Sequence, residues 1–134
     1  MRRHQSGLWA FIGVVALLVV GCGGGGSSEP EVNLSVDQTS QLIESEADLQ
    51  LVDVRTQEEW DEGHIAGAIH IPVDELGGRL SELDKTKPTV TYCAAGGRSA
   101  RALNLLEQEG FNTKGHLAKG IRGWMAAEKE VVTD

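Results

Sequence analysis

Basic residues, cysteines and long apolar runs are all scarce in this chain. Lysine and arginine together number 12 against 20 aspartates and glutamates, which gives a formal net charge of −8. This balance disfavours nucleic acids and anionic membrane surfaces as partners that bind through bulk electrostatics. We therefore expect no nucleic-acid partner. Any site for an anion must be local, built from backbone amides and one or two arginines.

Residues at the spacing of metal ligands are also lacking. His64 and His70 are six residues apart, across an expected loop and strand, and no nearby cysteine or carboxylate completes a ligand set. We therefore expect neither a metal ion nor another cofactor. His116 is interpreted as a core or surface residue, and Trp60 and Trp124 as packing anchors.

The longest apolar run lies near the amino terminus, from Leu8 to Val20. It is shorter than the roughly 20 residues that span a bilayer, and the two arginines before it are typical of a secretory signal. The run ends Val19-Val20-Gly21-Cys22, which resembles the lipobox of bacterial lipoproteins. By that resemblance, residues 1–21 are a cleaved signal peptide and Cys22 carries a lipid. The alternatives are an ordinary signal peptide or an uncleaved anchor.

A Gly/Ser-rich stretch, residues 22–31, follows as a flexible tether to one domain at residues 32–134. Lipoprotein sorting depends on an aspartate after the lipidated cysteine, and Gly23 stands there instead. We expect a lipid-anchored protein of the cell envelope that contacts the membrane through the lipid on Cys22. It would lie at the outer membrane, facing the periplasm, if the cell has two membranes. A monomer is the default expectation.

The second of the two cysteines, Cys93, is then left without an intramolecular disulfide partner. It ends a β-prone run and is followed by small residues, and a helical pattern begins at Arg98. A thiol at a helix start, within a ring of backbone N–H groups, is favoured to ionise. A buried, inert cysteine is the alternative. The small neighbours offer little side-chain cover, and Arg98 adds positive charge, so we expect a reactive thiol.

Strand and helix patterns alternate along the domain, which predicts an α/β fold with a mainly parallel sheet. In such sheets ligands gather at the carboxyl ends of strands, where Cys93 lies. Asp53 and Arg55 also follow a strand; we interpret them as bracing loops, with Arg55 able to pair with Glu59. The expected strands are 32–34, 49–54, 68–71, 89–92 and 113–117, and the expected helices are 36–46, 56–61, 73–83, 99–109 and 121–131.

Four separated motifs follow one another along the domain: Leu51-Val52-Asp53-Val54-Arg55 with Glu59-Trp60, Gly63 to Pro72, Tyr92-Cys93 through Arg98-Ser99, and Lys119 to Trp124. In this order they make the chain resemble the rhodanese family of single-domain sulfurtransferases over about residues 32–131. The resemblance implies a central, mainly parallel five-stranded sheet with helices on both faces. The family usually has a Gly-Gly pair near the last motif, and Lys119 stands at its first position.

The resemblance also implies a catalytic cysteine. Cys93 would take a sulfur atom from a small donor such as thiosulfate, hold it as a persulfide and pass it to a thiol or cyanide. Arg98 would bind the anionic end of the donor. Loop amides and the helix dipole suffice to ionise the thiol, so no Cys/His dyad is expected. The substrate-binding loop would comprise Ala94, Ala95, Gly96, Gly97 and Ser99.

Two other functions stay open. Domains of this type also serve as sulfur carriers or as interaction modules without turnover, here at a membrane. A cysteine-dependent phosphatase or arsenate reductase is a remote alternative. Such phosphatases have five residues between cysteine and arginine, whereas four separate Cys93 from Arg98. The shorter loop suits one bound sulfur atom better than a tetrahedral phosphate.

Overall fold

A single sheet organises the part of the chain that the computed structural model describes, residues 32–134. All of its neighbouring strands pair in parallel, which confirms the predicted α/β fold. The strand order β1-β5-β4-β2-β3 places β4 at the centre, and Cys93 follows β4 directly. The strands are β1 (Asn33–Leu34), β2 (Gln50–Asp53), β3 (Ile69–His70), β4 (Thr89–Tyr92) and β5 (Thr113–Leu117).

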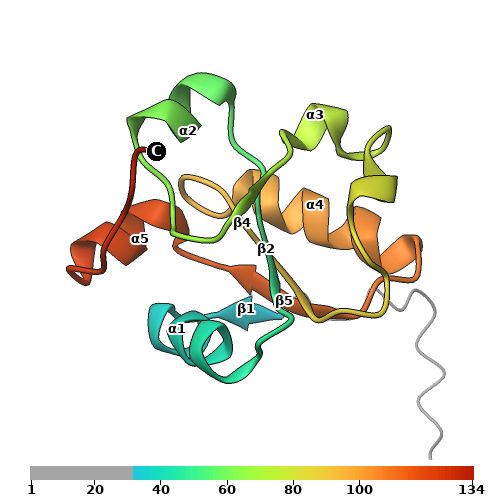
Figure 1. The fold of residues 1–134 in the computed structure, drawn as a ribbon, viewed down its shortest axis with the longest axis horizontal. Helices are drawn as coiled ribbons and strands as arrows, with labels where there is room; N and C mark the ends of the chain where they lie inside the picture. Colours follow the sequence, from blue (N-terminus) through green and yellow to red (C-terminus); the bar gives the residue numbers. More distant parts are fainter. Residues whose placement is uncertain (1–31) are drawn as a thin grey trace, which may run out of the picture.

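Helices cover both faces of the sheet (Figure 1). The reason is visible in β2, where Leu51 packs into one apolar cluster and Val52 into the other. One cluster lies toward α3 and α4, and the second toward α1 and α5. The helices are α1 (Val36–Ser45), α2 (Gln57–Glu62), α3 (Val73–Leu76), α4 (Gly97–Gln108) and α5 (Gly120–Ala126), with a 3-10 turn at Leu80–Glu82.

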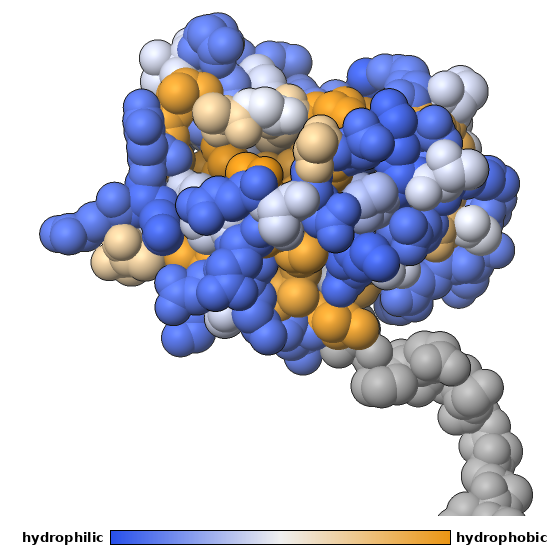
Figure 2. Space-filling view, turned by 60° about the horizontal axis from the view of Figure 1, so that its bottom comes forward, coloured by the Kyte–Doolittle hydropathy of each residue, from blue (hydrophilic) through white to orange (hydrophobic). Residues whose placement is uncertain are grey.

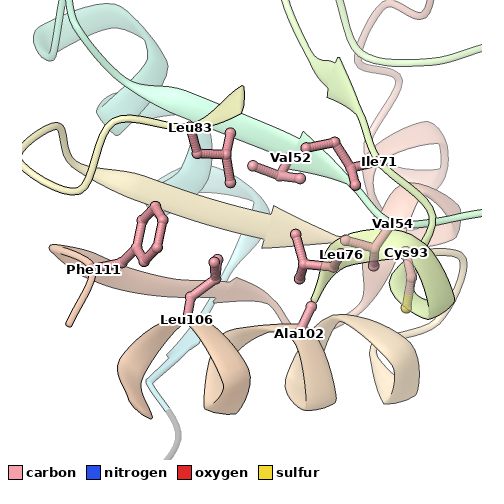
Figure 3. Packing of buried hydrophobic residues seen from close by; sticks show 9 residues of the cluster. All are labelled: Val52, Val54, Ile71, Leu76, Leu83, Cys93, Ala102, Leu106 and Phe111. Atoms are coloured by element: carbon pink, nitrogen blue, oxygen red, sulfur yellow. The ribbon is translucent and has the colours of Figure 1, made fainter. Parts of the chain in front are cut away.

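Cys93 belongs to the cluster on the α4 side (Figure 3). It lies at the end of a row of buried side chains, next to the start of α4, and Ala102 and Leu106 of α4 face the same row. The core therefore fixes the position of the thiol from one side. The other side is formed by the loop that joins β4 to α4.

Local signals predict most helix starts correctly. Ser35 with Gln38 and Thr56 with Glu59 both form capping boxes, which start α1 and α2. The expected helix over 73–83 is interrupted at Gly77 and Gly78, two residues that weaken helices, and it splits into α3 and the 3-10 turn.

The last helix is shorter than predicted, because it ends at Ala126 rather than near 131. Glu128 takes a left-handed conformation with φ 60°, and its N–H donates to the Met125 carbonyl. The Lys129 N–H donates to the Trp124 carbonyl, which completes a Schellman C-cap. A glycine usually occupies the left-handed position, so a glutamate there gave no signal in the sequence.

Hydrophilic residues cover most of the face shown in Figure 2, and apolar residues on it lie in separate patches. No helix in residues 32–134 is both long and apolar enough to cross a bilayer. The expected signal peptide, the tether and Cys22 lie outside the described residues.

Candidate active site

The Cys93 side chain is covered, with only 1% of the residue exposed. The expectation of a thinly covered thiol is therefore wrong. The loop after β4 folds around the sulfur, and the apolar side chains of the α4-side cluster pack against the residue from behind. Because the loop residues are small, the loop backbone packs closely around the Cys93 sulfur and covers it from solvent.

The backbone N–H groups of the loop point inward, as predicted. The Gly96 N–H donates to Cys93 Sγ at 3.1 Å, and Ser99 Oγ lies 3.5 Å from the same sulfur. Burial alone raises the pKa of the Cys93 thiol. Hydrogen bonds from the Ser99 hydroxyl and from the amides of Ser99, Gly96 and Ala95 lower this pKa by more than burial raises it, so the net shift is downward. The site favours a thiolate.

A second turn, Ala118 to Gly120, clamps this loop. The Ile121 N–H at the start of α5 donates to the Cys93 carbonyl at 2.8 Å, and the Arg122 N–H to the Ala94 carbonyl at 3.2 Å. Gly120 has φ 62°, and a Cβ there would collide with the backbone of Ala94 and Ala95.

Lys119, by contrast, has φ −90° and ψ 0°, a negative-φ conformation that non-glycine residues take in tight turns. The turn therefore needs glycine at position 120 only, and the lysine does not disturb its shape.

Arg98 does not reach toward the sulfur with a free guanidinium. Its two terminal nitrogens donate to the carboxylate of Glu59 in α2 at 2.7 and 2.9 Å. Both side chains are about one-third exposed, at 32% and 31%. Hydrogen bonding to Arg98 is the main reason that the pKa of Glu59 is lowered to about 2. The Glu59 carboxylate is thus already bound to the guanidinium of Arg98 at the rim of the site.

This pairing also corrects the expected Arg55–Glu59 ion pair. Arg55 instead holds the buried carboxylate of Asp53, with its terminal nitrogen 2.6 Å from Oδ2. The same guanidinium donates to the backbone carbonyls of Glu59 and Gly63, at 3.2 and 2.7 Å. Asp53 and Arg55 therefore brace loops, as interpreted from the sequence.

A polar chain behind the sulfur was not foreseen. His116 of β5 lies 2.9 Å, through Nδ1, from Ser99 Oγ, and 2.8 Å, through Nε2, from Asn33 Oδ1 of β1. His116 is 3% exposed. Asn33 and His116 are register partners in neighbouring parallel strands, 83 residues apart in sequence. No local pattern in the sequence signals such a pairing.

The other two histidines within residues 32–134, His64 and His70, serve the fold around α2. The Trp60 ring stacks on His64, with centroids 3.5 Å apart, and on His70 at 4.8 Å. Trp124 is buried and donates from Nε1 to the Glu130 carbonyl, so both tryptophans pack as expected. Within residues 32–134, no three His, Cys, Asp or Glu side chains are grouped to hold a metal ion.

Comparison with known proteins gives a consistent result. Residues 35–127 match the family described as "Rhodanese-like domain". The "Putative sulfur carrier protein YrkF" of Bacillus subtilis is 34% identical over 98 residues, 73% of this chain and 52% of YrkF. The chain thus spans about half the length of that relative.

Two further relatives match over nearly their whole length. The "Putative sulfurtransferase YtwF" of Bacillus subtilis is 33% identical over 96 residues, 72% of this chain and 92% of YtwF. The crystal structure of a rhodanese-related protein from Thermoplasma volcanium superposes with a TM-score of 0.70 at 30% identity, covering 76% of this chain and 98% of that one. The similarity therefore extends across the described domain.

Proposed function

Because the chain belongs to the rhodanese-like domain family, we propose that it is a sulfurtransferase that carries a sulfur atom on Cys93. The observation that carries this proposal is the inward Gly96 N–H on a cysteine sulfur at the end of the central strand. The loop amides and Ser99 lower the pKa of this thiol, so a larger fraction of it is the nucleophilic thiolate than in an ordinary cysteine.

The proposed reaction has two displacement steps. The Cys93 thiolate attacks the outer sulfur of a donor such as thiosulfate, a sulfur–sulfur bond forms, and sulfite leaves with the electron pair of the bond that breaks. An acceptor thiolate or cyanide then attacks the terminal sulfur of the persulfide, which releases the Cys93 thiolate. The N–H groups of Gly96 and its neighbours stabilise the negative charge on the cysteine sulfur at both stages.

Arg98 is proposed to attract the anionic end of the donor. Arg98 does so while it is bound to Glu59, and the negative charge of Glu59 weakens the attraction of Arg98 for the donor. The loop residues Ala94, Ala95 and Gly97 contribute backbone rather than polar side chains. The preference for a donor therefore rests on size and charge at the rim.

The proposal is tested by thiocyanate formation from thiosulfate and cyanide with the purified full chain in detergent. We expect turnover by the native protein and none by Cys93→Ser, which keeps the size of the side chain. Full activity of Cys93→Ser would overturn the scheme. Hydrolysis of an aryl phosphate that is lost in Cys93→Ser would favour the phosphatase alternative.

A sulfur carrier is the second candidate, because the relative YrkF is named as one and Cys93 is almost fully covered. In this case Cys93 gains one sulfur atom from a donor, but small acceptors do not remove it. Mass spectrometry of the peptide that contains Cys93 distinguishes the two candidates. A stable adduct without thiocyanate formation indicates a carrier.

We also propose that the domain works at a membrane surface, tethered through a lipid on Cys22. The proposal rests on the Val19-Val20-Gly21-Cys22 sequence after a short apolar run, and on the Gly/Ser-rich stretch that follows it. The placement in the cell envelope, facing the periplasm where two membranes exist, follows from the same residues.

A further inference from the structure

A buried histidine stands two hydrogen bonds from the Cys93 sulfur. Ser99 Oγ is the link, 3.5 Å from Cys93 Sγ and 2.9 Å from His116 Nδ1. The far side of the imidazole is held by Asn33, whose Oδ1 lies 2.8 Å from Nε2. Cys93, Ser99 and His116 are each exposed by 3% or less, so water does not compete for the contacts among these three residues.

Proton counting shows why the arrangement matters. The Ser99 hydroxyl has one proton, but Cys93 Sγ, the Gly96 carbonyl at 3.0 Å and His116 Nδ1 all lie within reach of its oxygen. The Asn33 oxygen only accepts, so His116 Nε2 carries a hydrogen. A neutral His116 then has a bare Nδ1, which takes the Ser99 proton. A charged His116 donates from Nδ1 and frees the Ser99 proton for the sulfur.

We propose that His116 is a positioning residue that sets the ionisation of Cys93 through the Ser99 hydroxyl. The Cys93 S–H proton passes to Ser99 Oγ as the Ser99 hydroxyl proton passes to His116 Nδ1. The products are a thiolate, an intact serine hydroxyl that donates to it, and an imidazolium that donates to Ser99 and Asn33. No proton leaves the buried cluster, so the charge separation needs no outside base.

Among the side chains of residues 32–134, His116 contacts those of Asn33 from β1 and Ser99 from α4, which are uncharged. Cys93 lies in the field of Arg98 from α4, whose own partner is Glu59 from α2. Asp53 of β2 also acts on Arg98 but is paired with Arg55.

The inference goes beyond sulfur transfer, because it concerns how the thiol ionises, and its test measures no sulfur transfer. The rate at which iodoacetamide alkylates Cys93 in the full chain is followed by mass spectrometry from acid to alkaline pH. In His116→Asn, which keeps a hydrogen-bonding side chain without a titrating charge, we expect alkylation near pH 6 to slow by about tenfold. The whole rate profile should move to higher pH.

Asn33→Asp is the matched variant of opposite sign. A carboxylate at this exposed position favours the imidazolium and should speed alkylation at neutral pH, through Ser99. A carboxylate acting directly on the sulfur would slow it. A merely structural contact predicts no acceleration, so an unchanged or slower rate in Asn33→Asp overturns the proposal.

Ser99→Ala tests the link itself. If His116 acts through Ser99, His116→Asn adds little further effect in a Ser99→Ala background, whereas independent effects would multiply. Should His116→Asn fail to fold, NMR titration of the His116 ring in the native protein and in Cys93→Ser decides the matter. We expect His116 to lose its proton at lower pH once the thiolate is absent, and identical titrations would refute the coupling.

Discussion

At the scale of single residues, the site differs from a simple cysteine–arginine pair in what holds each side chain. Cys93 receives N–H groups from its own loop, while Arg98 is bound by a carboxylate from another helix. Since the pKa of Glu59 is lowered to about 2, this carboxylate remains ionised at neutral and mildly acidic pH. Mild acid therefore cannot free Arg98, but a substitution can.

We predict that Glu59→Gln makes the site more receptive to anions. Glutamine keeps the capping box with Thr56 but removes the negative charge from Arg98. The readout is the ratio of Cys93 alkylation rates with iodoacetate, an anion, and iodoacetamide, a neutral reagent of similar size. The ratio should rise up to about fivefold, since an ion pair this exposed is worth at most about 1 kcal/mol.

Glu58→Gln serves as the control, because it removes the same charge from the same helix, and the structure shows no ion pair between Glu58 and Arg98. An equal rise in both variants would mean that only net charge matters. No rise in Glu59→Gln would show that the ion pair does not screen Arg98.

At the scale of elements, the sequence predicts what short-range signals encode. Ser35 with Gln38 predicts a capping box for α1 and Thr56 predicts the cap of α2, and both helices start with a capping box, the second between Thr56 and Glu59. The end of α5 was not visible, because Glu128 adopts a left-handed conformation that glycine normally marks.

The site follows the same division between short-range and long-range signals. The loop from Cys93 to Ser99 is contiguous, so its N–H groups could be placed from sequence. Glu59 reaches Arg98 from 39 residues away, and Asn33 reaches His116 from 83 residues away. Both contacts arise from strand order and helix packing, which local patterns do not encode.

The contact between the Cys93 loop and the Ala118–Gly120 turn gives the prediction at this scale. Gly120→Ala places a Cβ against the Ala94 carbonyl and strains a left-handed position, which should cost about 1–3 kcal/mol of unfolding free energy. Because the strain falls on the loop that holds the thiol, the rate of Cys93 alkylation should fall as well. Urea denaturation and alkylation of the same samples measure the two effects.

Gly77→Ala controls for the substitution itself. Gly77 has φ −58°, and the space that an alanine Cβ would fill there is open. We therefore expect little change in stability or in alkylation rate. A Gly120→Ala protein that loses stability but reacts like the native one would show that the turn does not shape the site.

At the scale of the whole molecule, the sheet order determines where chemistry takes place. The central position of β4 puts Cys93 between flanking helices, and parallel pairing gathers the loops after β2, β4 and β5 at the same edge. The acidic surface, from a formal charge of −8, gives the domain no attraction of its own to anionic lipids. The proposed membrane association therefore rests on the segment before residue 32.

This reasoning predicts that Cys22→Ser releases the protein from membranes. With a lipid on Cys22, the native chain should partition into the detergent phase of a cloud-point separation. The variant, produced without residues 1–21, should move to the aqueous phase, because it then carries neither the lipid nor the apolar run from Leu8 to Val20. Cys93→Ser is the matched control and should partition like the native chain, since it changes the other cysteine within the folded domain. If the Cys22→Ser chain without residues 1–21 stays in the detergent phase, the folded domain itself associates with detergent, and lipid attachment is not what places the thiol at the membrane.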